Sequence, residues 1–229
     1  HDEQGDRGDV GERRDARRAA RLADRAAAGP GGLVAWLWGV PLVIHEQNAV
    51  GGLTNRWLAR LAQRVLQAFP DTFAGAATVG NPVRSAIRNV PDPAARLGPR
   101  HGPLHVLVIG GSQGARALNE KIPEALALLP AHERPKVWHQ GGRTLAVAQE
   151  AYRRAGVDAT LEAFIDDMAG ASAWADVVVC RAGASTIAEL AAAGCGAVLV
   201  PFPAAVDDHQ TRNGAYLVSR GAAVLVPEA

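Results

Sequence analysis

The chain has 229 residues, of which 48% are hydrophobic and 21% charged, and its formal net charge is +1. This balance provides no strong basic field for nucleic acid, and no apolar run of about 18 residues or more predicts a membrane-spanning helix. The two cysteines, Cys180 and Cys195, lack metal-ligand spacing, and no secretion signal precedes them. We therefore expect reduced thiols in a cytoplasmic protein.

Residues 1–28 differ in composition from the rest of the chain. They contain no aromatic residue, and Val10 and Leu22 are their only apolar side chains larger than alanine. Such a segment cannot contribute a core, so we expect disorder or at most a frayed surface helix. A GC-rich gene that is translated in the wrong reading frame can also yield a block rich in Arg, Asp, Ala and Gly. A non-native reading frame for residues 1–28 is therefore an alternative hypothesis.

Residues 29–84 predict a small first domain. A glycine turn leads into a short helix near residues 30–38, and residues 40–46 form an apolar strand. Apolar residues then recur at helical spacing over 54–66, which predicts a helix there. The next stretch, 85–103, is rich in proline and charge and has no long apolar run, so we expect a linker between two domains.

Residues 104–229 alternate between apolar strands and amphipathic helices. Strands are predicted at 104–110, 136–141, 159–164, 176–180, 196–202 and 222–227. Helices are predicted at 115–129, 144–156, 165–175, 186–194 and 209–221. Apolar strands separated by helices predict a parallel sheet covered on both faces, with ligands at the carboxyl ends of its strands.

A glycine turn, GGSQG at residues 110–114, follows the first of these strands. It departs from the G-x-G-x-x-G dinucleotide pattern, and the next strand ends in WHQG without the carboxylate that a ribose of NAD needs. A Walker loop is excluded because no Gly-Lys-Ser/Thr occurs. Two readings stay open for Ser112: it bonds a phosphate oxygen, or it only caps the helix.

The stretch CRAGASTIAELAAAG, residues 180–194, also joins a strand to a helix through glycine. Thr186 and Glu189 fit a T-x-x-E capping box, which would give Glu189 a structural role. Alternatively, the Glu189 carboxylate accepts both hydroxyls of a ribose, and the helix N-terminus beside it receives a diphosphate. The two interpretations remain open.

Two more polar stretches follow strands. In IHEQN, residues 44–48, His45 and Glu46 are candidate proton acceptors and Asn48 a candidate sugar contact, although the loop could equally cap the next helix. In DDHQTRN, residues 207–213, three adjacent residues cannot converge on one metal ion, so a sugar-binding Gln210 is preferred. Trp36 and Trp38 cannot both face the core of one helix, which makes one of them a candidate for a membrane interface.

Several of these stretches, in the same order along the chain, resemble the MurG family of N-acetylglucosaminyltransferases. The matching segments are GPGG, IHEQNAVGGLTNR, GNPVR, GGSQGAR, WHQGG, FIDDM, ADVVVCRAGASTIAELAAAG and DDHQTRN. The resemblance implies an α/β fold of the GT-B type, with two Rossmann-like domains built on parallel sheets. It places an incomplete acceptor-binding domain at 29–84, the linker at 85–103 and the UDP-sugar domain at 104–229.

The resemblance also implies roles for individual residues. Glu46 is the candidate catalytic base. The remaining residues would bind the substrate: Asn48, Arg84, Ser112, Ile165, Ala184, Ser185, Thr186, Ile187, Ala188, Glu189 and Gln210. Arg84 would neutralise the diphosphate, Ile165 would contact uracil through its backbone, and Gln210 would recognise the sugar. No metal and no cofactor is implied.

The implied reaction transfers N-acetylglucosamine from UDP-N-acetylglucosamine to the muramic acid of lipid I at the cytoplasmic face of the cell membrane. The chain lacks the glycine-rich loop with histidine that begins the family's first domain, and it lacks the family's closing helices. We therefore expect a chain truncated at both ends. Two alternatives remain: a related enzyme with another acceptor, and a remnant that binds UDP-sugar without catalysis.

Overall fold

The computed structural model describes residues 28–98, 102–111, 115–205 and 208–228. The chain divides between Gly80 and Asn81 into two compact units, which we call unit 1 and unit 2 in chain order. Each unit has its own parallel sheet. They are described separately below.

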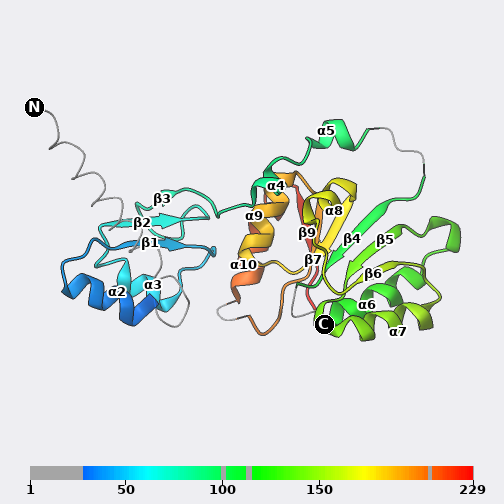
Figure 1. The fold of residues 1–229 in the computed structure, drawn as a ribbon, viewed down its shortest axis with the longest axis horizontal. Coiled ribbons are helices and arrows are strands. Elements are labelled where there is room, and N and C mark those ends of the chain that lie inside the picture. The colour runs from blue at the N-terminus through cyan, green and yellow to red at the C-terminus, as the bar shows by residue number, and fades with distance from the viewer. Residues whose placement is uncertain (1–27, 99–101, 112–114, 206–207, 229) are drawn as a thin grey trace, which may run out of the picture. The chain divides into compact units, whose positions relative to one another are not determined.

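Unit 1 is a three-stranded parallel sheet in the order β1-β2-β3 with two helices. Both helices cover the same face of that sheet in Figure 1. The elements are α2 (Ala28–Leu37), β1 (Val43–Glu46), α3 (Leu53–Leu58), β2 (Arg64–Gln67) and β3 (Ala77–Thr78). The polar residues after β1 therefore lie at the carboxyl edge of this sheet.

The helix predicted over residues 54–66 is wrong in its second half. α3 ends at Leu58, and Arg64–Gln67 form strand β2. Val65 is in register with Ile44 of β1, so the pairing between strands replaces the helical hydrogen bonds. Apolar spacing alone cannot separate the two outcomes because a short apolar segment fits both, and tertiary pairing decides.

The strands of unit 2 form a six-stranded parallel sheet in the order β6-β5-β4-β7-β8-β9. They are β4 (His105–Ile109), β5 (Lys136–Gln140), β6 (Thr160–Glu162), β7 (Val177–Cys180), β8 (Ala197–Leu199) and β9 (Ala223–Leu225). The chain runs outward from β4 in one direction and returns through β7 in the other. The order therefore reverses between β4 and β7, where a doubly wound sheet opens a crevice for ligands.

Helices cover both faces of the sheet of unit 2 (Figure 1). α6 and α7 pack on one face, and α8, α9 and α10 lie on the other. Their bounds are α6 (Arg116–Ala127), α7 (Leu145–Ala155), α8 (Met168–Trp174), α9 (Ala184–Ala193) and α10 (His209–Val218), with two short 3-10 turns at Ala131–Glu133 and Gly142–Thr144. The central strands are accordingly the most buried, and Leu107 and Val108 have no exposed surface.

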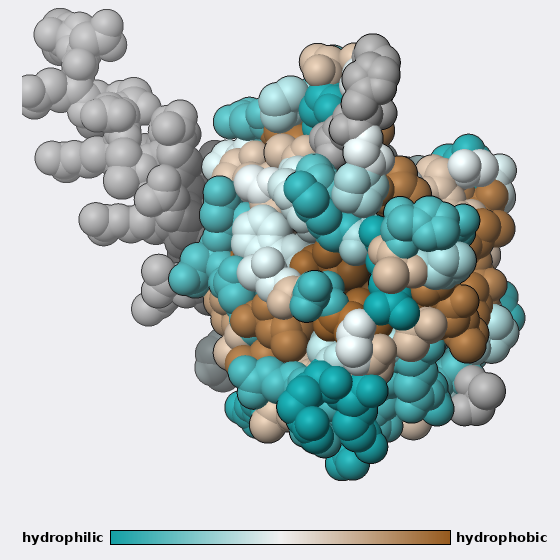
Figure 2. Space-filling view, turned by 90° about the vertical axis from the view of Figure 1, so that its right-hand side faces the viewer, coloured by the Kyte–Doolittle hydropathy of each residue, from teal (hydrophilic) through white to brown (hydrophobic). Residues whose placement is uncertain are grey.

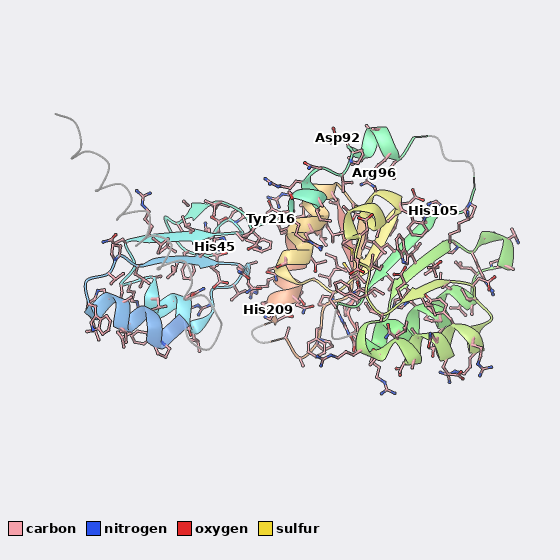
Figure 3. The ribbon with its side chains drawn as sticks, in the orientation of Figure 1. His45, Asp92, Arg96, His105, His209 and Tyr216 are labelled. Carbon is pink, nitrogen blue, oxygen red and sulfur yellow. The ribbon has the colours of Figure 1, made fainter. Side chains whose placement is uncertain are left out.

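The segment expected to be a linker contains two short helices, α4 (Ser85–Arg88) and α5 (Pro93–Arg96). Arg96, labelled in Figure 3, holds this segment against the rest of unit 2. Its guanidinium donates to the carbonyls of Ala193 and Gly194 at 2.8 and 2.9 Å and to those of Ser172 and Ala175 at 3.2 and 3.3 Å. These are carbonyls at the ends of α8 and α9, which lack partners within their helices.

Apolar surface is spread over both units. The face drawn in Figure 2 shows hydrophobic areas between hydrophilic ones. In unit 1, Trp38 and Trp57 are 81% and 67% exposed. Within the described ranges, no helix combines the length and apolarity needed to cross a bilayer.

Both cysteines are free thiols in the interior of unit 2. Burial raises the pKa of Cys180 to about 12. Burial also raises the pKa of Cys195, against the opposing influence of the nearby Arg96 guanidinium. Thiols of this kind are poor nucleophiles, because the thiolate is the reactive form.

Candidate functional site

Unit 2 has a pocket of about 230 Å³ at the carboxyl ends of β4, β5 and β7. Its lining residues come from the ends of β4 and β5, from the turns after β4 and β6, from α8 and α9, and from Arg84, which precedes α4. They are Arg84, Ile109, Gly111, Gln140, Phe164, Ile165, Met168, Thr186 and Glu189. Since β4 and β7 are neighbours, the two glycine turns predicted to bind phosphate follow adjacent strands.

The turn after β4 requires glycine. A side chain at Gly110 would place its Cβ 2.7 Å from the backbone nitrogen of Ala115, and Gly111 has a φ of +75°. The turn therefore brings bare backbone to the pocket, at Gly111, as an anion site needs. Ser112, the predicted phosphate contact, lies outside the described residues.

The turn after β7 leads directly into α9. Gly183 is the N-cap and α9 begins at Ala184, so Thr186 is the third helical residue and no side chain caps the helix. The predicted capping box, which needs Thr186 at the N-cap, therefore does not form. Ala184, Ser185, Thr186, Ile187 and Ala188 form the first turn and a half of the helix, with the Ile187 side chain buried in the core.

Glu189 instead forms an ion pair with Arg84 at the pocket wall. Arg84 Nε donates to Glu189 Oε1 at 2.8 Å, and Nη2 donates to Oε2 at 3.0 Å. Hydrogen bonding to the Glu189 carboxylate raises the pKa of Arg84. Both partners retain exposed surface, 55% for Arg84 and 24% for Glu189, so the pair is accessible to a ligand.

The opposite part of the pocket is mainly apolar. It is formed by Phe164 and Ile165 from the loop after β6, by Met168 at the start of α8, and by Gln140 at the end of β5. Gln140 is 2% exposed, and its Oε1 accepts a hydrogen bond from the backbone N–H of Ile165 at 3.1 Å. Sequence reasoning missed Gln140 as a site residue, although its place at a strand end before a glycine turn was a usable signal.

In unit 1 the two predicted polar residues lie in one hydrogen-bonded loop. The Glu46 carboxylate, 3% exposed, accepts from the backbone and Nδ2 of Asn48 at 2.9 and 3.3 Å through Oε1. Its Oε2 accepts from the backbone N–H of Gly52 at 3.1 Å and from Asn55 Nδ2 at 2.9 Å. Four donors thus satisfy a buried carboxylate, which fastens the loop between β1 and α3.

α10 begins at His209, which is labelled in Figure 3, and Gln210 is its second residue. Gln210 is not among the residues that line the pocket. Its Oε1 accepts a hydrogen bond from the backbone N–H of Phe202 at 2.9 Å. The contact fastens the chain after β8 to the start of α10. Among the described residues, no group of three or more His, Cys, Asp or Glu side chains is placed to hold a metal ion.

The fold has a close counterpart among solved structures. The crystal structure of MurG from Acinetobacter baumannii superposes with a TM-score of 0.79 at 43% sequence identity, covering 89% of this chain and 58% of that one. Two parallel-sheet units and a pocket at the strand-order reversal of the second therefore define a glycosyltransferase of the GT-B class.

Sequence comparison gives the family. The glycosyltransferase family 28 C-terminal domain matches residues 105–229, and the N-terminal domain of the same family matches residues 20–67. The chain belongs to glycosyltransferase family 28 and, within it, to the MurG family.

Two curated relatives carry the name UDP-N-acetylglucosamine–N-acetylmuramyl-(pentapeptide) pyrophosphoryl-undecaprenol N-acetylglucosamine transferase. The protein from Nitrosococcus oceani is 62% identical over 205 residues, and the protein from Marinobacter nauticus is 58% identical over 205 residues. These matches cover 88% and 87% of this chain but 57% and 56% of the relatives. The chain thus spans little more than half their length.

Proposed function

We propose that this protein transfers N-acetylglucosamine from UDP-N-acetylglucosamine to the C4 hydroxyl of the muramic acid in lipid I, with inversion at the anomeric carbon. The product is lipid II, a precursor of peptidoglycan, whose synthesis serves cell shape and division. The pocket at the β4–β7 reversal is the observation that carries the proposal, because it gathers four residues assigned to the UDP-sugar: Arg84, Ile165, Thr186 and Glu189.

The chemistry of the pocket suits a nucleoside diphosphate. The two oxygens of the Glu189 carboxylate match the two hydroxyls of a ribose, which are hydrogen-bond donors. The Arg84 guanidinium and the N-terminus of α9 would stabilise the negative charge that develops on the leaving diphosphate. UDP would therefore take over both members of the Arg84–Glu189 pair.

In unit 1 we propose that Asn48 contacts the donor and that Glu46 positions it. A general base needs a lone pair that can reach the acceptor hydroxyl. Both oxygens of Glu46 already accept hydrogen bonds in a buried loop, which favours positioning over proton abstraction. Gln210 and Ser112 would complete the contacts to the sugar and the diphosphate.

The lipid acceptor implies a peripheral position at the cytoplasmic face of the cell membrane. Exposed apolar and aromatic side chains at the end of α2 support this part of the proposal, since Trp36, Leu37 and Trp38 are 46%, 65% and 81% exposed. Tryptophan favours the boundary between acyl chains and headgroups.

The direct test measures radiolabel transfer from UDP-N-acetylglucosamine to a lipid I analogue by the 229-residue chain. The full-length Nitrosococcus oceani relative serves as the positive control. Transfer to the lipid I analogue, but not to simple glycosides, supports the proposal. Transfer to glycosides alone would indicate another acceptor. Calorimetric binding of UDP without turnover would indicate a non-catalytic donor-binding protein and contradict the proposed transfer.

A further inference from the structure

Gln140 occupies an unusual place for a neutral polar side chain. It is the last residue of β5, which lies between β6 and β4 in the sheet. The residue is only 2% exposed, and it still lines the pocket. The same pocket is lined by the apolar residues Phe164, Ile165 and Met168, and Gln140 contacts the backbone of Ile165. An amide in a largely apolar slot carries a strong requirement for hydrogen-bond partners.

The hydrogen bond from Ile165 fixes which end of the amide is which. A backbone N–H can only donate, so the atom 3.1 Å from the Ile165 nitrogen is the Gln140 oxygen. The Nε2 group is then the other end of the amide. Within the described part of the chain, the structure records no hydrogen bond donated by this group. Gln140 therefore offers the donors of its Nε2 group to whatever fills the slot, while Oε1 is engaged by Ile165.

We infer that Gln140 is a specificity-determining residue that donates from Nε2 to the 4-carbonyl oxygen of uracil. The inference rests on the proposed function, which places a uridine diphosphate in this pocket. Uracil has a carbonyl acceptor at position 4, whereas cytosine has an amine donor there. A protein donor that faces this position can hydrogen-bond to the uracil carbonyl. With cytosine, the protein donor would face the amine of the base, which is also a donor, and no hydrogen bond would form.

The sheet order supports this orientation of the base. Glu189 is on the helix that follows β7, and Gln140 ends β5, with β4 between the two strands. A ribose at Glu189 therefore directs its base across the end of β4 toward β5. The 4-position lies on the part of the ring that is remote from the ribose, and it would reach Gln140. Phe164 and Met168 would contact the faces of the ring.

Glu is the most informative substitution because it keeps one part of the interaction and removes the other. In Gln140→Glu, a carboxylate oxygen still accepts from Ile165, so the loop retains its anchor. The donor is lost, and the second oxygen becomes an acceptor that suits the cytosine amine. Its charge would weaken all nucleoside diphosphates alike, so the ratio of UDP to CDP affinity is the quantity to measure.

The experiment is calorimetric titration of the full chain with UDP, CDP and 4-thio-UDP. We expect the wild-type chain to bind UDP about tenfold or more tightly than CDP, and this ratio to fall by about tenfold in Gln140→Glu. Gln149→Glu, the same change at an exposed position of α7, should leave the ratio unchanged. An unchanged ratio in Gln140→Glu overturns the inference.

A ligand-side measurement keeps the test decisive if the variant does not fold. Sulfur is a weaker acceptor than oxygen, so wild-type protein should bind 4-thio-UDP more weakly than UDP, and equal affinity overturns the role of Gln140. A wild-type chain that binds UDP no better than CDP, or binds neither, would instead count against the uridine pocket itself. The two failures are therefore distinguishable.

Discussion

Arg84 and Glu189, which are 105 residues apart in the sequence, are joined by two parallel charge-assisted hydrogen bonds at the wall of the pocket. Each residue is proposed to bind a different part of the same ligand. The unliganded chain therefore pairs the cation for the diphosphate with the carboxylate for the ribose. Since an exposed ion pair contributes about 1 kcal/mol or less to stability, a ligand can replace it at small cost.

The first prediction concerns Arg84→Ala and separates the two halves of the ligand. UDP affinity should fall by about tenfold, because a charge-assisted contact to phosphate is lost. Uridine affinity should stay the same or rise, because Glu189 is released from its partner. Calorimetry with both ligands measures the difference, and Arg88→Ala in α4, the short helix that Arg84 precedes, is the charge-matched control.

An equal loss for UDP and uridine would contradict this account. It would mean that Arg84 acts by holding Glu189 in place and has no contact with phosphate. Thermal unfolding of both variants should change little, since the pair is partly exposed.

The second prediction concerns Glu46→Gln in unit 1. The amide can accept at one end only, so its NH₂ group would face donors that the carboxylate now satisfies, from Gly52 and Asn55 on one side or Asn48 on the other. Amide hydrogen exchange over residues 47–53 should accelerate, while exchange in β5 of unit 2 stays unchanged. Glu124→Gln, a change at an exposed helical residue, is the control. Unchanged exchange in the loop would show that Glu46 does not fasten it.

The third prediction concerns the contacts that Arg96 makes with the ends of α8 and α9. Arg96→Ala should lower the free energy of unfolding by about 2–3 kcal/mol, because several helix-end carbonyls lose their partner at once. Arg96→Lys should recover only part of this, since one ammonium cannot reproduce the fork of the guanidinium. Urea unfolding measures both, and a loss no larger than that of Arg88→Ala would contradict the prediction.

The sequence was informative about unit 2 for a physical reason. Strands of a parallel sheet are buried on both faces and stand out as apolar runs, and glycine turns mark the edge where ligands bind. The predicted strands and helices after residue 104 are all present, with α9 starting two residues earlier than expected. In unit 1 the helix predicted over residues 54–66 was wrong in its second half. The apolar spacing fits a helix, but the end of the segment pairs with β1, which lies elsewhere in the chain.

The candidate site was predictable only where local pattern and position agree. Thr186 and Glu189 follow a glycine turn at a strand end, and they do line the pocket. The pairing of Glu189 with Arg84 has no local signature, because it depends on how the segment around α4 packs against α9 within unit 2. Phe164 and Met168 are ordinary apolar residues in the sequence, and only the path of the chain from β6 into α8 brings them to the pocket.

The last prediction concerns His139, which has no exposed surface and contacts Tyr152 Oη through Nδ1 at 3.1 Å. Burial lowers the pKa of His139 from 6.5 to about 4. Between these values the unfolded chain binds a proton that the folded chain does not, so folded-state stability falls as the pH falls from about 6.5 to about 4. The loss attributable to this group is about 3 kcal/mol.

His139→Gln removes the titrating group while keeping a polar side chain of similar length. The variant should be less stable than wild type at pH 7, where the neutral imidazole fits its buried place, and the difference should shrink as the pH falls toward 4.5. Urea unfolding of both proteins across this range measures it, and every other titration cancels in the comparison. A stability difference that stays constant with pH would mean that His139 accepts its proton in the folded state as readily as in the unfolded one. The imidazole would then have to reach water or an acceptor that the buried strand position does not supply.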